Sequence, residues 1–310
     1  MARTASATTR TNARPAGRLP RREATRLRVL LDVFKLCIGV TIGLTALAGL
    51  AVAPGSVGLW QGLGVVLAVT LASAAAGAFN QYVERTGDAA MTRTRRRAFV
   101  TGRLRAGPAW PAIIATVGLA GVALAWLAGN PVAALHTFLG AFTYGVVYTV
   151  WLKRRTAWNI VVGGLAGSFA VLAGAAAVTP VPAAVPLALA LTLFLWTPPH
   201  FWSLSIAFSD DYRAAGVPML PVVIGNERAA RAVFAGAAML VASSLLPAFA
   251  GLSWIYLACA IAGGAWLLVT SARLVAAPGR GAAMRNFHAS LVQLTLLLGG
   301  AIADALILHA

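Results

Sequence analysis

The chain has 310 residues, of which 59% are hydrophobic and only 11% are charged, and its net charge is +17. A soluble domain is about a quarter charged, so this composition excludes a soluble protein and indicates a membrane protein. The excess of positive charge does not favour a nucleic-acid-binding protein, because the basic residues are confined to the N-terminal segment, the start of the first apolar run and alternate connections between apolar runs.

Residues 1–28 form a polar first segment. It holds eight arginines among many alanine and threonine residues, with one acidic residue and no apolar face. Such a composition is typical of a disordered tail. We therefore expect a basic cytoplasmic tail at 1–28 and one polytopic membrane domain at 29–310. The composition also resembles a mitochondrial transit peptide, and this alternative stays open.

Apolar runs long enough to cross a bilayer then follow one another along the chain. Runs of about 18 or more apolar residues are candidate transmembrane helices, and continuous runs of this length indicate helices rather than a barrel. The predicted fold is an all-α membrane protein with nine transmembrane helices. The expected spans are 31–53, 57–79, 107–129, 131–152, 158–179, 183–207, 230–250, 253–274 and 287–308.

The connections between these runs alternate in charge. Arginine and lysine are absent from the connections after the odd-numbered spans and gather in those after the even-numbered spans, at 85–105, 153–155, 213–231 and 273–285. Basic loops stay on the cytoplasmic side. The pattern predicts a cytoplasmic N-terminus and an outside C-terminus in the inner membrane of a cell, with the mitochondrial inner membrane as the alternative.

The first polar cluster is NQYVERTGDAAMTRTRRR, at 80–97. Asn80, Glu84 and Asp88 are spaced four apart, so a helix would present them on one face, and we expect Gly87 to loosen the helix and let Asp88 turn inward. Oxygen ligands of this kind suit Mg2+ that is shared with substrate phosphates, and arginines supply bidentate phosphate contacts. The cluster predicts a metal–diphosphate site, with a salt-bridge cluster as the alternative.

A second cluster follows the sixth span, where FLWTPPHFWSLSIAFSDDYRAAGVPMLP contains Asp210 and Asp211. Four of the eight acidic residues thus lie at the predicted cytoplasmic ends of two spans, and ionisable groups at such positions tend to be functional. No P-loop, nucleophile elbow, zincin or dinucleotide motif is present in the sequence. A diphosphate attached to a long apolar tail would fit, with its head at the mouth of the bundle.

Three segments resemble the UbiA-type intramembrane prenyltransferases, and in particular their haem-modifying branch: NQYVERTGDAAMTRTRRR, YTVWLKRRTAWNIVVGGLAG and the stretch from WTPPHFW through DDYRAAGVPMLP. The resemblance covers about 30–305. It implies a UbiA-type bundle around a central cavity. Thr86 stands where that family usually has a further aspartate.

The resemblance also implies a reaction and its partners. Farnesyl diphosphate would donate its farnesyl group to a vinyl group of haem B, giving haem O for haem–copper oxidases, with Mg2+ as cofactor and the lipid bilayer as surroundings. Haem A synthase or oxidase assembly factors are possible protein partners, and nucleic acid is not expected. The alternatives are a prenyltransferase with another acceptor, a catalytically reduced haem-binding relative that serves oxidase assembly, and a polytopic transporter.

The implied site residues fall into two groups. Catalytic and metal-binding roles are implied for Asn80, Glu84, Asp88, Asp210 and Asp211. Substrate binding is expected for Arg93, Arg97, Lys153, Arg154, Tyr148, His200, Trp202 and Tyr212. The depth of His200 suits a contact with the porphyrin or its iron, and the alternative is a histidine packed beside Pro198 and Pro199. His288 is a second candidate for a haem contact.

Overall fold

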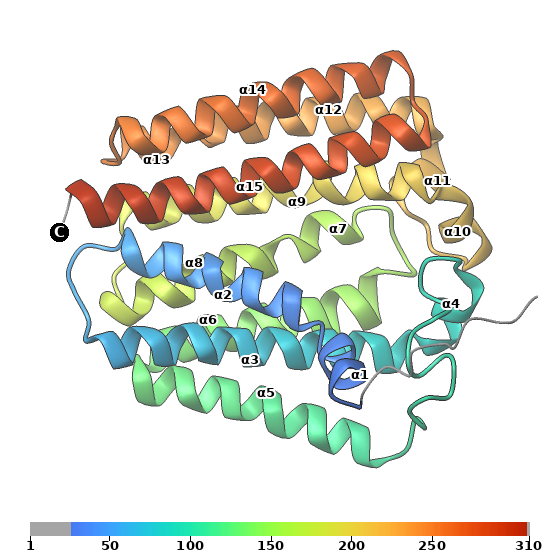
Figure 1. Cartoon of the computed structure of the whole chain (residues 1–310), viewed down its shortest axis with the longest axis horizontal. Coiled ribbons are helices and arrows are strands. Elements are labelled where there is room, and N and C mark those ends of the chain that lie inside the picture. Colours follow the sequence, from blue (N-terminus) through green and yellow to red (C-terminus); the bar gives the residue numbers. More distant parts are fainter. Residues whose placement is uncertain (1–25, 309–310) are drawn as a thin grey trace, which may run out of the picture.

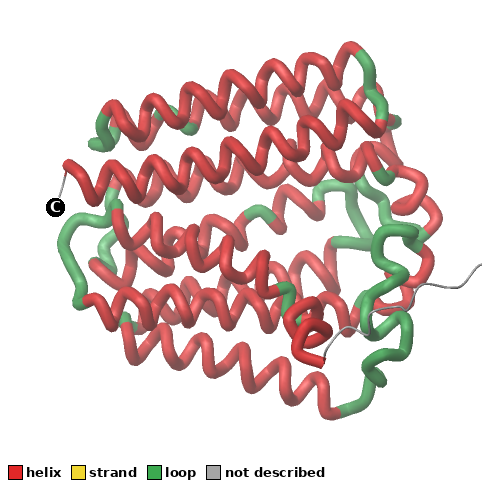
Figure 2. The backbone as a smooth tube through the Cα atoms, in the orientation of Figure 1, coloured by secondary structure: helices red, strands yellow, loops and turns green. Residues whose placement is uncertain are grey.

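The computed structural model describes residues 26–308, and all regular secondary structure in that range is helical (Figure 2). The first half comprises α1 (Arg26–Val33), α2 (Leu36–Ala51), α3 (Leu59–Val83), α4 (Arg85–Ala90), α5 (Ala109–Ala128), α6 (Pro131–Phe142), the π-helix η1 (Thr143–Leu152), α7 (Asn159–Gly163) and α8 (Leu165–Val178). The second half comprises α9 (Ala184–Ala207), α10 (Ser209–Ala214), α11 (Leu220–Ile224), α12 (Asn226–Ser243), α13 (Leu246–Phe249), α14 (Trp254–Ala276) and α15 (Arg280–Leu308). The all-α prediction is confirmed.

Eight helical segments within residues 26–308 are long and apolar enough to cross a membrane, and a ninth crossing exists if α1 and α2 count as one bent span. These two helices meet at an angle of 50°. Lys35, between them, has φ 47° and ψ 46°, a left-handed conformation that few residues other than glycine adopt. The expected first span is therefore broken where the sequence pattern predicts a continuous helix.

The tail expected at 1–28 lies outside the described residues except for its last three, which form the first turn of α1.

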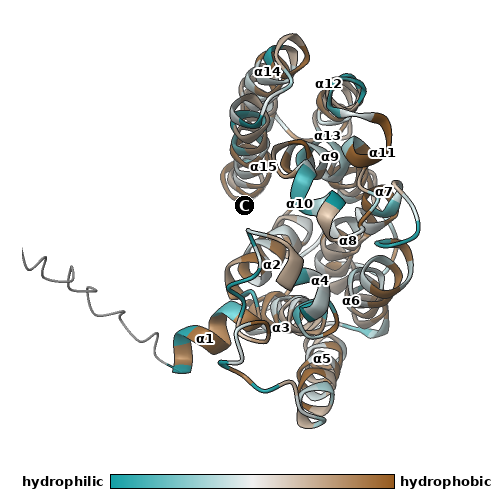
Figure 3. Ribbon diagram, turned by 90° about the vertical axis from the view of Figure 1, so that its right-hand side faces the viewer, coloured by the Kyte–Doolittle hydropathy of each residue, from teal (hydrophilic) through white to brown (hydrophobic). Residues whose placement is uncertain are grey.

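The long helices run side by side in two groups (Figures 1 and 3). In one group α3 packs along α5 and α2 along α8, and in the other α14 packs along α15 and α12 along α9. The groups meet where α8 contacts α9 and α15 contacts α2. The short helices α4, α10 and α11 all lie at one end of the bundle, opposite the C-terminus (Figure 1). We call this end the motif end.

The contact between α2 and α8 depends on two glycines. A side chain at Gly49 would overlap the Val171 carbonyl, and one at Gly174 would overlap the Ala46 carbonyl. Small residues at such positions let two helices in a membrane approach until their backbones touch, and close packing of this kind holds them together in the absence of a hydrophobic driving force.

Two further spans are irregular where they approach the motif end. The helix that begins as α6 changes into η1, in which the Lys153 amide donates to the Tyr148 carbonyl five residues earlier. The expected span at 158–179 is divided at Gly164 into α7 and α8. π-Helical turns occur often at functional sites, and both irregular segments lead to the residues described next.

Candidate active site at the motif end

The first acidic cluster lies where α3 gives way to α4. Asn80 is in the last turn of α3, Glu84 joins the two helices, and Asp88 is in α4; all three are buried, with exposed fractions of 5%, 2% and 2%. The helix breaks at Glu84 and not at Gly87 as we expected. Gly87 has another effect: a side chain there would overlap the guanidinium group of Arg154. Its absence makes room for that arginine beside Glu84.

Glu84 is held by two cations from the loop after η1. The Lys153 Nζ donates to its Oε2 at 2.6 Å, and the Arg154 Nη2 lies 3.4 Å from the same oxygen. Lys153 is itself buried. Burial lowers the pKa of the Lys153 ammonium below its ordinary value of 10.5, and the nearby Glu84 carboxylate opposes that shift. The pair brings into direct contact two buried charges that lie just beyond the ends of two spans, α3 and η1.

Asp88, in α4, is held by residues of the loop that follows this helix. The Arg97 Nη1 donates to its Oδ2 at 2.6 Å, while the Thr94 hydroxyl donates to the Asp88 backbone carbonyl at 3.0 Å. The chain therefore folds back after α4, so that the arginine nine residues after Asp88 reaches the carboxylate.

Asn80 connects α3 with η1 and with the turn between α1 and α2. The Lys35 Nζ donates to its Oδ1 at 2.7 Å and to the Tyr144 hydroxyl at 3.0 Å, and the Asn80 Nδ2 donates to Thr149 Oγ1 at 3.1 Å. Lys35 lies within electrostatic range of Arg93, Arg97, Glu84 and Asp88. The left-handed residue between α1 and α2 thus carries a side chain that enters the same cluster.

The second acidic cluster divides into one paired and one exposed carboxylate. Asp211 accepts hydrogen bonds from Thr92 Oγ1 at 2.8 and 2.7 Å and from the Arg93 amide at 3.3 Å. Slight burial raises the pKa of the Asp211 carboxyl, but these hydrogen bonds outweigh it and the net shift is downward. The Asp210 side chain is 93% exposed and pairs with Arg213 at 2.6 Å. Of the two aspartates, only Asp211 contacts Thr92 and Arg93 in the loop that follows α4.

Tyr212 and Tyr148 line the region between the two clusters. The Arg93 Nη2 lies 3.4 Å from the Tyr212 hydroxyl, and burial raises the pKa of that hydroxyl against the opposing effect of Arg93. Tyr148 stacks on Tyr144 at 5.8 Å between ring centroids and packs against the cluster that contains Met91 and Tyr212. Aromatic rings therefore form the wall next to the charged groups.

His200 and Trp202 lie deeper, on α9. The His200 ring stacks between the rings of Trp196 and Phe287, with distances between ring centroids of 4.1 Å and 4.3 Å. Its Nδ1 lies 2.7 Å from Ser290 Oγ, and because that hydroxyl donates to the Phe287 carbonyl, the histidine Nδ1 is the donor. The proton on Nδ1 leaves the lone pair of Nε2 unprotonated. Trp202 is buried, and its Nε1 has no hydrogen-bond partner within the described chain.

His288 lies at the edge of this stack, where its ring makes an edge-to-face contact with Phe287 at 5.5 Å between ring centroids. It is exposed on α15 and lines a groove toward α14, so the structure does not bring it to the charged cluster. Contact of haem with either histidine stays a prediction.

The charged cluster at the motif end combines five cationic side chains with three carboxylates: Lys35, Arg93, Arg97, Lys153 and Arg154 with Glu84, Asp88 and Asp211. Residues 26–308 contain no group of three or more His, Cys, Asp or Glu side chains placed to hold a metal ion by themselves. An excess of arginine and lysine around few carboxylates suits a ligand that brings its own negative charge.

Sequence reasoning missed four residues in or next to this cluster: Lys35, Thr92, Tyr144 and Thr149. Lys35 lies within the first expected span, and a lysine within an apolar run is a signal of function. Thr92, Tyr144 and Thr149 carry no such signal, because their partners come from segments distant in the sequence.

Comparison with known proteins agrees with this geometry. The sequence model of the UbiA prenyltransferase family matches residues 42–296. The chain is 58% identical to protoheme IX farnesyltransferase 2 of Paramagnetospirillum magneticum, over 91% of this chain and 98% of that protein. It is 48% identical to protoheme IX farnesyltransferase 1 of the same organism, over 89% of this chain and 98% of that protein.

Solved structures share the fold at low sequence identity. A structure described for digeranylgeranylglyceryl phosphate synthase superposes with a TM-score of 0.73 at 17% identity, covering 91% of this chain and 99% of that one. A UbiA homologue from Archaeoglobus fulgidus bound to DMAPP and Mg2+ gives 0.68 at 15% identity, covering 90% and 99%. The chain therefore belongs to the UbiA prenyltransferase family and, within it, to the group of the protoheme IX farnesyltransferases.

Proposed function

We propose that this protein transfers the farnesyl group of farnesyl diphosphate to a vinyl group of haem B and so makes haem O. The observation that carries the proposal is that two carboxylates are buried at the mouth of an apolar helical bundle and that each is paired with a cation. Glu84 is paired with Lys153, and Asp88 with Arg97. The high identity to protoheme IX farnesyltransferases supports haem as the acceptor. Residues 29–310 would form the transferase domain.

The oxygen donors of the first cluster fit Mg2+. Asn80, Glu84 and Asp88 offer an amide oxygen and two carboxylates on neighbouring turns, and Mg2+ typically takes one or two carboxylates together with substrate phosphates and waters. A related fold binds DMAPP together with Mg2+. When bound, the ion would neutralise the negative charge that develops on the diphosphate as it leaves.

The cationic side chains are proposed to change partners when substrate binds. Lys153 and Arg154 contact Glu84, and Arg97 contacts Asp88. With the carboxylates of Glu84 and Asp88 holding Mg2+, these cations and Arg93 would be free to contact the phosphate oxygens of the substrate. They would stabilise the leaving diphosphate at the moment when the bond between farnesyl C1 and oxygen breaks.

The apolar bundle would protect the allylic cation from water until the acceptor attacks. The terminal carbon of the vinyl group forms the new bond to farnesyl C1, and water then adds to the inner vinyl carbon and loses a proton, which leaves a hydroxyl group. We place the porphyrin near His200 and Trp202. The free lone pair inferred for His200 Nε2 would suit a contact with the haem iron.

The motif end is proposed to face the cytoplasm of a bacterial cell, with the protein in the inner membrane. The arginine-rich connections all lie at this end, and the opposite connections contain no lysine or arginine. Asp210 remains a metal ligand only by resemblance to the family, because its carboxylate is exposed and paired with Arg213.

The proposal is tested by expressing the chain in cells that lack their own haem O synthase and extracting the haems. Haem O, or haem A made from it, is expected with the natural sequence and is expected to disappear with Glu84→Gln or Asp88→Asn. The proposal would be overturned if the protein is well expressed and inserted in the membrane but the extracted haem B is unaltered. If the purified protein instead prenylates another aromatic acceptor, the proposal that haem B is the acceptor is wrong, while the proposal of prenyl transfer is supported.

A further inference from the structure

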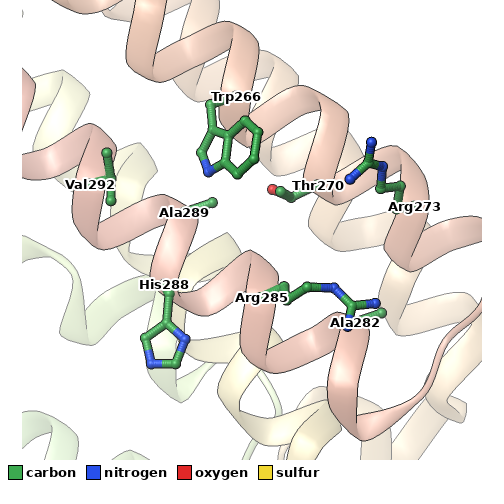
Figure 4. A pocket seen from close by; sticks show the side chains of 8 residues that line it. All are labelled: Trp266, Thr270, Arg273, Ala282, Arg285, His288, Ala289 and Val292. Carbon is green, nitrogen blue, oxygen red and sulfur yellow. The ribbon is translucent and has the colours of Figure 1, made fainter.

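A groove of about 240 Å³ opens between α14 and α15 near the motif end (Figure 4). Trp266, Thr270 and Arg273 line it from α14, and Ala282, Arg285 and Ala289 line it from α15. None of these six residues belongs to the charged cluster of the candidate active site, although His288, the second candidate for a haem contact, also lines the groove. The groove lies apart from the charged cluster, so a ligand can bind there independently of prenyl transfer.

The spacing of residues on the two helices creates the groove. Trp266, Thr270 and Arg273 follow one another at four and three residues, so they share one face of α14. On α15, Ala282 and Ala289 lie three residues before and four residues after Arg285, on the same face, and both alanines are buried. Their small side chains leave the space that Arg285 borders. Figure 4 shows one guanidinium group from each helix at the same end of the groove and the indole farther along it.

The arginines of the groove have no acidic partner. No aspartate or glutamate occurs between Glu227 and Asp304, and neither Arg273 nor Arg285 forms an ion pair or side-chain hydrogen bond with any described residue. By contrast, Arg97 and Arg154 in the active-site cluster are both paired. Two unpaired guanidinium groups at one mouth favour a ligand with a phosphate group, which arginine binds in a bidentate manner.

The groove faces outward from the bundle and continues into an apolar surface. The helix α14 lies at the edge of the molecule and packs chiefly on α15 and α12 (Figure 3). Trp266 is 52% exposed, and Val269, Leu291 and Val292 are exposed beside it. Tryptophan is enriched at the level of lipid headgroups, and basic pockets between transmembrane helices bind the headgroups of anionic lipids. This order of side chains matches a phospholipid with its head at the arginines and its acyl chains along α14 and α15.

We propose that the groove is a binding site for one anionic phospholipid. Arg273 and Arg285 contact the oxygens of its phosphate, and the Trp266 indole lies against the boundary between its glycerol and its acyl chains. The site holds the end of the α14–α15 pair in the cytoplasmic leaflet, where anionic lipids supply the complementary charge.

The first experiment compares two double variants of the purified full-length protein. Arg273→Gln/Arg285→Gln removes the charges of the groove. Arg228→Gln/Arg231→Gln removes two exposed arginines from the start of α12 and serves as the matched control. Retention of phosphatidylglycerol is measured by native mass spectrometry, with zwitterionic phosphatidylcholine, which has no net charge, as the reference. We expect the affinity for phosphatidylglycerol to fall roughly ten- to thirty-fold in the groove variant, since each arginine near a membrane surface contributes about 1 kcal/mol.

The control variant is expected to keep its affinity. An equal loss in both variants would mean diffuse electrostatic attraction and would overturn the site, as would the absence of any loss in the groove variant.

A second experiment locates the lipid and identifies its chemistry. Phosphatidylglycerol with brominated acyl chains is expected to quench tryptophan fluorescence less in Trp266→Phe than in the natural protein. Displacement of the lipid by inorganic phosphate at millimolar concentration would show a site for free anions. Displacement by haem B but not by its dimethyl ester would assign the groove to haem propionates. Either displacement, or equal quenching in Trp266→Phe, would overturn the proposal.

Discussion

At the scale of single residues, the site consists of buried charges whose partners come from other segments. The spacing of Asn80, Glu84 and Asp88 predicts a common location, and the structure buries all three at the motif end. Their partners were less predictable. Lys153 is 69 residues from Glu84 in the sequence, and no local pattern shows which loop will meet which carboxylate. The sequence thus identifies the acids, while the pairing requires the fold.

The two aspartates of the second cluster are expected to differ in importance. Asp211 holds the loop of the first cluster through Thr92 and the Arg93 amide, whereas Asp210 is in solvent. Each lost hydrogen bond to a charged group costs about 1.5–3 kcal/mol, so we expect Asp211→Asn to reduce the rate of prenyl transfer at least tenfold, with a smaller loss in Asp210→Asn. Initial rates with purified protein measure both. A greater loss in Asp210→Asn would identify that residue as a metal ligand.

The pH dependence of the reaction is expected to report on Lys153. Burial disfavours the ammonium and lowers the pKa of Lys153 in the folded protein below its ordinary value of 10.5. Between the lowered pKa and 10.5 the folded protein therefore binds fewer protons than the unfolded chain. The free energy of unfolding rises with pH in that window. Activity that needs the ammonium should instead fall as pH rises through the lowered pKa.

The measurement is the pH profile of kcat in the natural protein and in Lys153→Arg, whose guanidinium stays charged throughout. The alkaline decrease is expected to disappear in the variant. An unchanged decrease in an active, folded Lys153→Arg protein would show that another group causes it.

At the scale of helices, the apolar runs predict where spans lie but not how they are wound. The left-handed turn at Lys35, the π-helix η1 and the division at Gly164 all fall within runs that a hydropathy pattern treats as continuous. Hydrophobicity records that a segment is buried in lipid or protein, and it carries no information about the hydrogen-bond register of the backbone. All three irregularities lie in spans that lead to the charged cluster of the candidate active site.

The contact between α2 and α8 makes a testable contrast between two glycines. An added methyl group at Gly174 would overlap the Ala46 carbonyl, whereas at Gly299 on α15 nothing lies within 4 Å. Overpacking typically costs about 1–3 kcal/mol, while replacing glycine by alanine inside an open helix stabilises by roughly 0.5–1 kcal/mol.

We therefore expect Gly174→Ala to lower the Tm of the detergent-solubilised protein and Gly299→Ala to keep or raise it. The two Tm values are read from thermal unfolding of the purified variants. Equal Tm values would show that α2 and α8 move apart without cost.

At the scale of the whole molecule, charge distribution and fold agree. The basic connections that the sequence places on one side of the membrane lie at the motif end, together with α4, α10 and α11 (Figure 1). The neighbours of each span were not predictable, because nearly every long helix is apolar on all faces and several neighbours are equally compatible with that pattern. The packing of α3 on α5 and of α14 on α15 depends on small residues that let the helices approach closely, at Gly121 against Ala68 and at Gly263 against Gln293.

The proposed orientation is tested with single cysteines in a Cys37→Ala/Cys259→Ala background, since both natural cysteines are free. Ala277 lies in an exposed loop at the motif end, and Ser56 lies in an exposed loop at the opposite end. A maleimide that does not cross membranes is expected to label Ser56→Cys in intact cells and Ala277→Cys only after permeabilisation. The reverse pattern would place the active site outside the cell.

The π-helix also changes how scanning mutagenesis of this span must be interpreted. Tyr144 and Thr149 are five residues apart, and the Thr149 hydroxyl donates to the Tyr144 carbonyl at 2.8 Å. On an ordinary α-helix, positions five apart are rotated by about 140° from each other. An α-helical wheel drawn through 143–152 would therefore assign one of the two to the lipid side and the other to the interior. Tolerance to substitution in this segment is expected to repeat with a longer period than in the rest of the bundle, and a profile aligned on the α-helical repeat would misplace the residues that contact Lys35 and Asn80.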